Sequence, residues 1–231
     1  VTIEGSDVNH IKNVLRMKPG EKIRVCTRNG QNYFCSISDI TESFVRADIL
    51  EKEAESTELP CRIYLFQGLP KNDKMEWIIQ KTVELGVYEV IPVAMKNCVV
   101  KLDDKKAKSK VMRWQAIAES AAKQSKRSLI PEVKMPMSYK EAVAYAKELD
   151  VKLVPYENEH GMAGTKAAME QIKKGESIAV FIGPEGGFAP EEIALVQDEM
   201  QLISLGKRIL RTETAGIAAL AILGYQLESS D

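Results

Sequence analysis

The sequence has few histidines, no paired cysteines and no long apolar run, and each shortage excludes a class of protein. No stretch of 18 or more residues is continuously apolar, which argues against a membrane-spanning helix. Two histidines and four cysteines without a C-x-x-C pair leave no readable zinc site and no disulfide framework. We therefore expect a cytoplasmic protein with reduced thiols, no metal and no membrane partner. The numbering starts at Val1 without a signal-peptide pattern. Because an initiator Met is missing, we expect the numbering to begin inside a longer protein.

The chain also lacks an excess of charge of either sign. Its formal net charge is −1, so any contact with a nucleic acid depends on local basic patches. Residues 10–28 hold six basic side chains against one acidic side chain, and residues 96–113 hold seven against two. Each patch taken alone is typical of an ordinary solvated face. Phosphate backbones nevertheless favour such patches, which makes both of them candidates for RNA contact.

The first part of the chain, residues 1–58, has the pattern of a small β-barrel domain. A helix is expected over residues 7–17, and Asn29-Gly30 is a typical hairpin turn. The strands that this pattern predicts are 22–26, 33–37 and 44–50.

The second part, residues 61–231, alternates strands and helices after an acidic linker over 51–58 and Pro60. This alternation predicts an α/β domain with a parallel sheet. The expected strands are 61–67, 88–94, 151–156, 177–182 and 201–205, and the expected helices are 73–85, 106–124, 139–149, 165–173 and 190–200. The last helix has Pro190 at its start but a poor N-cap in Ala189, so we expect a slightly weakened start.

Two glycine-containing loops follow strands near the C-terminus. The run over residues 178–182 is continuously apolar, as in a strand buried on both faces, and leads into Gly183-Pro184-Glu185-Gly186-Gly187-Phe188. A second loop runs from Leu205 to Ala215. Ligands of parallel sheets bind at the carboxyl ends of the strands, so we expect both loops to border one cleft.

The chemistry of the first loop argues against a phosphate ligand. Phosphate cradles usually include a lysine, whereas this loop holds Glu185 and no base. A carboxylate suits a neutral or locally cationic ligand, and S-adenosylmethionine, with its sulfonium and no phosphate, fits. The alternative is a tight turn in which Glu185 favours the positive end of the next helix. The second loop, with two arginines and Thr-Glu-Thr before a helix, favours a binding role.

Together, residues 183–188 and 205–215 resemble the signature of the ribosomal RNA small subunit methyltransferase E family. The resemblance covers nearly the whole chain. It continues through residues 10–16, 74–81 and 84–86, and through Glu119, Gln124, Arg127 and Pro131.

This resemblance implies a fold and an activity. The fold is a SPOUT-type methyltransferase domain with a trefoil knot over residues 61–231, preceded by a PUA-like β-barrel RNA-binding domain over 1–58. The activity is S-adenosylmethionine-dependent methylation of N3 of a uridine in 16S rRNA, within the small ribosomal subunit, by a homodimer. Two other functions stay open: a non-catalytic RNA-binding protein, and a SPOUT methyltransferase that acts on another RNA. A nucleotide-binding enzyme would need a Walker or dinucleotide motif, which the sequence lacks.

Site residues follow from the same resemblance. Arg211 is the candidate that stabilises the uridine anion, and Glu119 and Glu213 are candidates for the base. The structural alternatives are a surface carboxylate for Glu119 and a helix-start charge for Glu213. Cofactor contacts are expected from Pro155, Gly183, Pro184, Glu185, Gly186, Gly187, Leu205, Gly206, Ile209, Leu210, Thr214 and Ala215.

RNA contacts are expected from a further set of polar residues on both parts of the chain. They are Lys12, Arg16, Lys22, Arg24, Lys74, Gln124, Arg127 and Arg208. If the helix that ends near residue 124 continues, Gln124 and Arg127 share a face and could line an RNA cleft. They could equally tie that helix to its neighbours by hydrogen bonds. The apolar stretch 215–227 predicts a core helix or a subunit interface.

Overall fold

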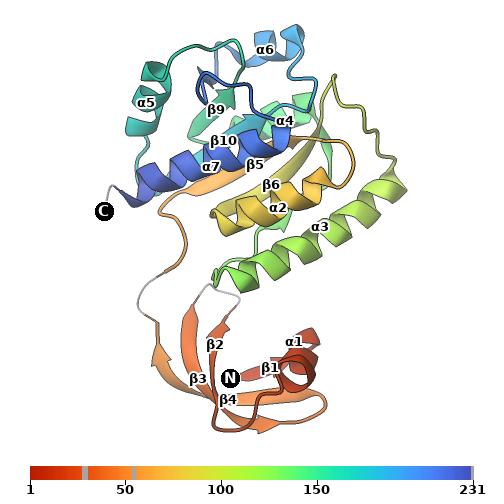
Figure 1. Ribbon diagram of the computed structural model, residues 1–231, viewed down its shortest axis with the longest axis vertical. Helices are drawn as coiled ribbons and strands as arrows, with labels where there is room; N and C mark the ends of the chain where they lie inside the picture. Colours follow the sequence, from red (N-terminus) through yellow and green to blue (C-terminus); the bar gives the residue numbers. More distant parts are fainter. Residues whose placement is uncertain (28–30, 54–55, 230–231) are drawn as a thin grey trace. The chain divides into compact units, whose positions relative to one another are not determined.

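The computed structural model describes residues 1–27, 31–53 and 56–229, and the chain divides into two compact units, residues 1–57 and 58–231 (Figure 1). Within the described residues, no helix has the length and apolar content that crossing a membrane requires.

The first unit is an antiparallel sheet with a short helical segment. Its elements are β1 (Thr2–Glu4), α1 (Ser6–Asn9), the π-helical turn η1 (His10–Val14), β2 (Lys22–Cys26), β3 (Asn32–Ile40) and β4 (Phe44–Lys52). The strand order is β1-β4-β3-β2, so the described strands form an open sheet, which curls, rather than the closed barrel that the pattern suggested. Its core is formed by Val8, Ile11, Ile37 and Val45.

The sequence predicted a helix and a hairpin turn in this unit. The helix expected over residues 7–17 is shorter and ends in a π-turn, in which the Leu15 N–H donates to the His10 carbonyl over 2.9 Å. The predicted hairpin turn at Asn29-Gly30 lies outside the described residues.

The second unit is a parallel α/β domain. Its elements are β5 (Arg62–Gly68), α2 (Lys74–Glu84), β6 (Val87–Ala94), α3 (Asp104–Gln124), β7 (Glu132–Val133), β8 (Met137–Ser138), α4 (Tyr139–Ala146), β9 (Val151–Pro155), α5 (Ala163–Glu170), β10 (Ser177–Ile182), α6 (Pro190–Val196), β11 (Gln201–Ile203) and α7 (Thr212–Glu228). The strand order is β11-β9-β10-β5-β6-β7, with β8 paired to β6, and every pairing is parallel. The prediction of a parallel α/β domain is confirmed.

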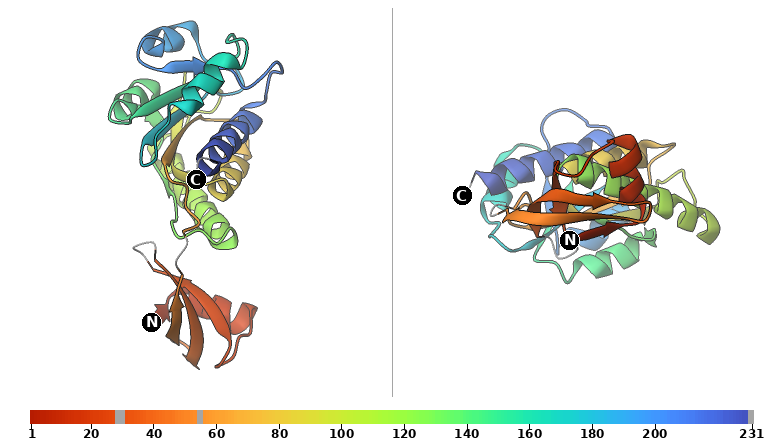
Figure 2. Two further views of the ribbon diagram at one scale, coloured as in Figure 1. Left: turned by 90° about the vertical axis from the view of Figure 1, so that its left-hand side faces the viewer. Right: turned by 90° about the horizontal axis from the view of Figure 1, so that it is seen from below.

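Two apolar layers hold the sheet of this unit between helices. Ile63 and Leu65 of β5 pack with α2, α3 and α7, whereas Tyr64 and Phe66 pack with α4 and α6. Helices therefore cover both faces of the sheet (Figure 2). Phe66 also stacks on Phe181 of β10, with ring centroids 4.3 Å apart. Because alternate side chains of a strand point to opposite faces, the central strands are buried on both sides and read as continuous apolar runs. The expected strand 177–182 has the observed bounds of β10.

Local capping explains where two helices begin. Helix α3 starts two residues before the predicted position, because the Asp103 carboxylate accepts the Lys106 N–H over 2.8 Å. Helix α6 lacks a capping side chain at Ala189, but the Glu192 carboxylate accepts the Ala189 N–H over 2.8 Å and the Lys96 N–H over 2.8 Å. Glu192 therefore compensates for the poor N-cap that the sequence showed.

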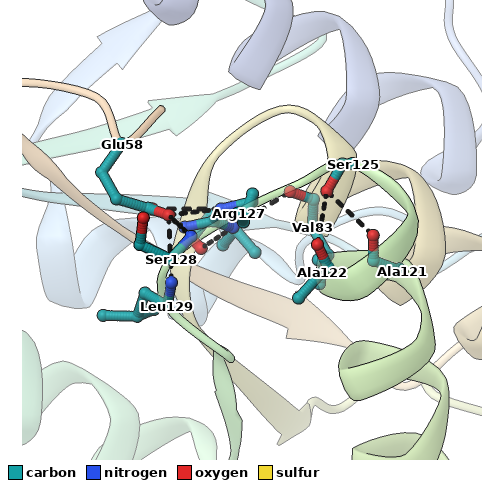
Figure 3. Close-up of polar contacts among 9 residues, drawn as sticks. Glu58, Val83, Ala121, Ala122, Ser125, Arg127, Ser128 and Leu129 are labelled. Atoms are coloured by element: carbon teal, nitrogen blue, oxygen red, sulfur yellow. Dashed lines mark hydrogen bonds and ion pairs between the residues drawn. The ribbon is translucent and has the colours of Figure 1, made fainter. Parts of the chain in front are cut away.

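The environment of Arg127 matches the second of the two alternatives, in which its side chain forms hydrogen bonds to neighbouring segments. Helix α3 ends at Gln124, so Gln124 and Arg127 do not share a helical face. The Arg127 side chain is 4% exposed and donates hydrogen bonds to the carbonyls of Val83, over 3.0 Å, and Val87, over 2.7 Å (Figure 3). This placement argues against the predicted RNA contact for Arg127, because a buried side chain cannot reach a phosphate without leaving its partners.

A carboxylate completes the environment of Arg127. The Glu58 side chain forms an ion pair with the guanidinium, and Nε of Arg127 lies 3.1 Å from Glu58 Oε2 (Figure 3). The other oxygen of Glu58 accepts the N–H groups of Ser128, over 2.8 Å, and Leu129, over 3.1 Å. Glu58, the first residue of the second unit, is thus bound to the segment after α3. Through Arg127, this segment is also bound to both ends of the turn between α2 and β6.

Candidate functional site

The carboxyl ends of β9, β10 and β11 meet at one edge of the sheet, and a cavity of about 590 Å³ lies there. Its walls come from three loops, over residues 155–160, 182–188 and 204–212, together with Lys74 and Ala215. Both glycine-containing loops therefore border one cleft, as expected from the position of ligands in parallel sheets.

Most of the residues predicted for the cofactor line this cavity. They are Pro155, Gly183, Pro184, Glu185, Gly187, Leu205, Gly206, Ile209, Leu210 and Ala215. Gly186 and Thr214 are not among the lining residues. Gly186 packs instead on Asn97, since a Cβ at position 186 would lie 3.0 Å from the Asn97 Cβ. Thr214 is an exposed residue in the first turn of α7.

The loop after β10 is held in a tight conformation. Gly187 has a φ of +65°, a conformation that L side chains rarely adopt, and its N–H donates to the Pro184 carbonyl over 2.9 Å. The Asn97 amide donates to the carbonyls of Gly186, over 3.0 Å, and Gly187, over 3.2 Å. On the other side, a Cβ at Gly68 would lie 2.6 Å from the Pro184 nitrogen. The loop backbone thus touches two neighbouring segments, which restricts its shape.

The start of α7 is fixed to the two central strands. The Thr212 hydroxyl donates to the Gly183 carbonyl over 2.6 Å and accepts from the Gln67 amide over 2.9 Å. Gln67 is fully buried in β5. These bonds join the ends of β5 and β10 to the loop before α7, so the walls of the cavity are connected by buried polar groups.

Asn97, Gln67 and Thr212 were not predicted as site residues. Gln67 left one signal in the sequence, because a lone amide at the end of an otherwise apolar strand needs a polar partner once it is buried. Thr212 lies inside the second loop but was not assigned a role. Asn97 follows β6, two strands away from β10 in the same sheet, and no local pattern connects it to residues 186 and 187.

Lys74 lies between two carboxylates of the cavity region. Its Nζ is 3.0 Å from Glu185 Oε1 and 3.3 Å from Glu213 Oε2. The hydrogen bond with Glu185 raises the pKa of Lys74, against a smaller opposing effect of burial. Burial would raise the pKa of Glu185, but the hydrogen bonds from Lys74 and from the Glu185 and Lys71 N–H groups together lower it. Both groups are therefore charged at neutral pH.

This pairing corrects the interpretation of Glu185. Its charge is compensated by Lys74 and by the Lys71 N–H, which donates to the carboxylate over 3.1 Å. Glu157 is the more available acid of the cavity wall. Its Oε1 lies 3.4 Å from the position of a Cβ at Gly187, and its carboxylate has no hydrogen bond or ion pair within the described part of the chain. Glu159, from the same loop, also lines the cavity.

The candidate catalytic residues have three different environments. Arg211 lines the cavity as the N-cap residue of α7, without a side-chain capping bond. Glu213 lies in the first turn of α7 and is paired with Lys74. Glu119 lies on α3, where it forms an ion pair with Lys123 over 2.8 Å, and it does not line the cavity. Within a single chain, the structure brings together Arg211 and Glu213 but not Glu119.

The predicted RNA contacts differ in their availability. Arg208 lines the cavity and is exposed, and Gln124 is exposed at the last turn of α3. In the first unit, Lys12 forms an ion pair with Glu42, and Arg24 Nε lies 2.8 Å from Glu53 Oε2. Arg16 and Lys22 are exposed, and neither forms an ion pair in the ranges that the structure describes. These two keep their charge available.

The basic patch over residues 96–113 is partly compensated by acids from elsewhere in the second unit. Lys96 pairs with Glu191, and Lys110 lies 3.5 Å from Asp73. Arg113 lies 2.8 Å from Glu76. Because three of the seven bases have acidic partners from outside residues 96–113, the local excess of positive charge is smaller than the sequence indicated.

Fold and site together define a parallel α/β protein with a cavity between three loops at the carboxyl edge of its sheet, the usual position of a small-molecule site. The chain matches the model of an RNA methyltransferase domain over residues 57–224 and that of an RNA methyltransferase PUA domain over residues 3–50. It is 39% identical to Ribosomal RNA small subunit methyltransferase E of Bacillus subtilis, over 98% of this chain and 90% of that protein. The protein therefore belongs to the ribosomal RNA small subunit methyltransferase E family of RNA methyltransferases.

Solved structures agree with this assignment. A crystal structure of a hypothetical protein is 39% identical, has a TM-score of 0.94 and covers 100% of this chain and 93% of that one. The crystal structure of Ribosomal RNA small subunit methyltransferase E from Neisseria gonorrhoeae, bound to S-adenosyl methionine, is 32% identical with a TM-score of 0.84. It covers 97% of this chain and 91% of that chain.

Proposed function

We propose that this protein transfers a methyl group from S-adenosylmethionine to N3 of a uridine in 16S rRNA. The observation that carries the proposal is the cavity formed by three loops at the carboxyl edge of the sheet, in a chain of this methyltransferase family. The Neisseria relative was crystallised with this cofactor, which supports the same ligand here. The substrate, a component of the bacterial small ribosomal subunit, implies a cytoplasmic enzyme.

The residues of the cavity fit S-adenosylmethionine. A volume of about 590 Å³ is in the range of small-molecule sites. Gly183 and Gly187 let the loop backbone approach a ligand closely, because neither has a side chain in the way. Ile209 and Leu210 supply apolar surface for an adenine, and Glu157 supplies a negative charge for a cationic ligand. Pro155, Leu205 and Ala215 complete the apolar wall.

Methyl transfer requires a deprotonated uridine N3 that lies in line with the bond from sulfur to the methyl group. The cofactor supplies an electrophilic methyl group, whose bond to sulfur breaks with its electron pair moving to sulfur. Uridine N3 must lose its proton before its lone pair forms the new bond to carbon. Arg211 stays charged at neutral pH and stabilises the developing negative charge on the uracil. Of the two candidate bases, Glu213 lies in a segment that borders the cavity, although its carboxylate already forms an ion pair with Lys74.

Methyl transfer to small subunits tests the proposal directly. Subunits from cells that lack the enzyme are incubated with the protein and labelled S-adenosylmethionine, and the product is located by reverse transcription. A methyl on N3 blocks base pairing, so we expect one enzyme-dependent stop at a single uridine. Transfer to another RNA alone would indicate a different substrate. Absence of cofactor binding in calorimetry would favour a non-catalytic RNA-binding protein.

Glu157→Gln is expected to weaken the binding of S-adenosylmethionine by about three- to tenfold, because the substitution removes a negative charge near the sulfonium. Binding of S-adenosylhomocysteine, whose sulfur is neutral, should change less. Isothermal titration calorimetry with both ligands measures the difference. Equal losses for the two ligands would mean that Glu157 contacts a group they share, and unchanged affinities would remove Glu157 from the ligand contacts.

The fold of the second unit includes a trefoil knot in this proposal. Support comes from the match to the RNA methyltransferase domain model. The start of α7 lies at the centre of the sheet. Thr212 bonds to the end of β10 and, through Gln67, to β5. The first unit, with its PUA match over residues 3–50, is the proposed RNA-binding domain. The proposed polar contacts with RNA are Arg16 and Lys22 in the first unit, and Gln124 and Arg208 in the second unit.

The enzyme is proposed to act as a homodimer through α7. This helix buries Gly216, Leu220 and Leu223, yet its outer side is also apolar and includes Tyr225, which is 76% exposed. A helix that is apolar on all sides is normally covered on all sides. A second copy of the same face would cover it.

Tyr225→Lys is therefore expected to shift the protein from dimer to monomer at micromolar concentration, because a charge would be buried at the centre of the contact. Sedimentation velocity measures the distribution. Met112→Lys is the matched control, since Met112 is also 76% exposed but lies on α3. If both variants keep the mass of the wild type, α7 is not the contact.

A further inference from the structure

We propose that Lys74 is a positioning residue that holds the two cofactor loops in one fixed arrangement, rather than a contact for RNA. The inference rests on the proposed function, because it assigns a role within the same cavity. It concerns the juxtaposition of one ammonium group with two carboxylates, one in the loop after β10 and one in the first turn of α7.

The ammonium group is attached to a rigid element. Lys74 is the first residue of α2, and the next turns of this helix are buried in the core through Met75, Ile78 and Ile79. The side chain of Lys74 is itself partly buried, as are those of its two partners. Because α2 is anchored in the core, the position of the Lys74 ammonium is set by the fold and not by the loops that it contacts.

The two partners come from segments far apart in the chain, which the Thr212–Gly183 hydrogen bond also joins at one point. Glu185 lies in the loop after β10, and Glu213 lies 28 positions later in α7. Lys74 Nζ reaches both carboxylates, over 3.0 Å and 3.3 Å, so one cation bridges them. The Lys71 N–H adds a bond of 3.1 Å to Glu185 from the same turn. The start of α2 therefore acts as a common anchor for both loops.

Electrostatics explain why this position needs a cation. Without Lys74, two partly buried carboxylates would face each other with no compensating charge, and like charges at short range repel. The loops would then separate, or one carboxylate would take up a proton. Either change alters the cavity wall, since Glu185 lines it and Glu213 follows Arg211 by two residues.

An RNA contact would require the opposite behaviour. A lysine that binds a phosphate releases its protein partners, and its loss weakens RNA binding without affecting the cofactor. A positioning lysine that is lost weakens cofactor binding first, and the loss depends on the carboxylates that remain. The two roles therefore predict different results for the same substitution.

The test compares Lys74→Met, which keeps the unbranched apolar stem but not the charged group, with Lys74→Arg and the double variant Lys74→Met/Glu185→Gln. Calorimetry gives the Kd of S-adenosylmethionine, and single-turnover transfer to unmethylated small subunits gives the rate and the dependence on RNA. Lys81→Met is the control, because Lys81 lies on the same helix and pairs with Glu84 over 2.8 Å, outside the cavity.

We expect Lys74→Met to raise the Kd of the cofactor about tenfold and to slow transfer at saturating cofactor, because the loops are misplaced. Lys74→Arg should stay within about threefold of the wild type. Glu185→Gln in the Lys74→Met background should recover part of the loss, since a neutral amide removes the repulsion between the carboxylates. Lys81→Met should bind the cofactor as the wild type does.

A Lys74→Met variant with unchanged cofactor Kd and weaker RNA dependence would overturn the inference and restore the RNA contact. Equal losses of cofactor affinity in Lys74→Met and in Lys74→Met/Glu185→Gln would also overturn the inference. If Lys74→Met does not fold, a Lys74→Arg variant with tenfold weaker cofactor binding would contradict it. Failure of the wild-type protein to bind S-adenosylmethionine would instead reject the proposed function itself.

Discussion

Arg127→Met is expected to lower the free energy of unfolding of the second unit by about 3–5 kcal/mol, because removing one partner of a buried ion pair leaves the other charge uncompensated. The substitution leaves the Glu58 carboxylate without its cation and removes the donors to the carbonyls of Val83 and Val87. Urea unfolding measures the effect. Both tryptophans, Trp77 and Trp114, belong to the second unit, so their fluorescence reports this unit alone.

Two further variants separate the buried pair from general effects. Lys123→Met removes an exposed ion pair near the end of α3 and should cost less than about 1 kcal/mol. Adding Glu58→Gln to Arg127→Met should cost less than the sum of the single substitutions, because the amide has no charge to compensate. A loss below about 1 kcal/mol for Arg127→Met would show that the guanidinium is dispensable and would reopen a role at the surface.

Arg211→Ala is expected to slow methyl transfer by about 10²- to 10³-fold, while the Kd of S-adenosylmethionine stays within about threefold of the wild type. Arg211 lines the cavity but makes no capping hydrogen bond through its side chain, so the backbone of α7 should be unaffected. Single-turnover transfer at saturating cofactor gives the rate, and calorimetry gives the affinity.

Arg211→Lys is the matched control, because it keeps the charge but not the planar group with several donors. We expect it to recover part of the rate. A rate for Arg211→Ala within threefold of the wild type would remove Arg211 from the chemistry. A loss of cofactor affinity as large as the loss of rate would assign it to binding instead.

Local patterns in the chain sufficed for the architecture of the second unit. The strand over residues 177–182 could be predicted because its side chains are buried on both faces and read as one apolar run. The glycine-containing loops could be assigned to one cleft because strand ends in a parallel sheet share an edge. Short strands such as β7 and β8 could not be predicted, since two residues show no periodicity.

The charges of the site were harder to interpret from the sequence. Glu185 has the appearance of a free carboxylate in its loop, and Lys74 that of a basic residue near a helix start. Only the folded chain brings the two within 3.0 Å, across 111 positions. Glu157 lies two positions after Pro155 in the chain, and only the folded structure shows it as the available acid of the cavity wall.

The sequence by itself determined the class of fold, the family and the two loops that build the cavity. The tertiary structure decided which charges remain available to a ligand, and it decided that Arg127 is buried with Glu58, 69 positions away in the chain. The physical reason is the range of the interactions. Apolar periodicity and turn chemistry act between neighbours in the chain, whereas ion pairs form between any groups that folding brings within a few ångströms.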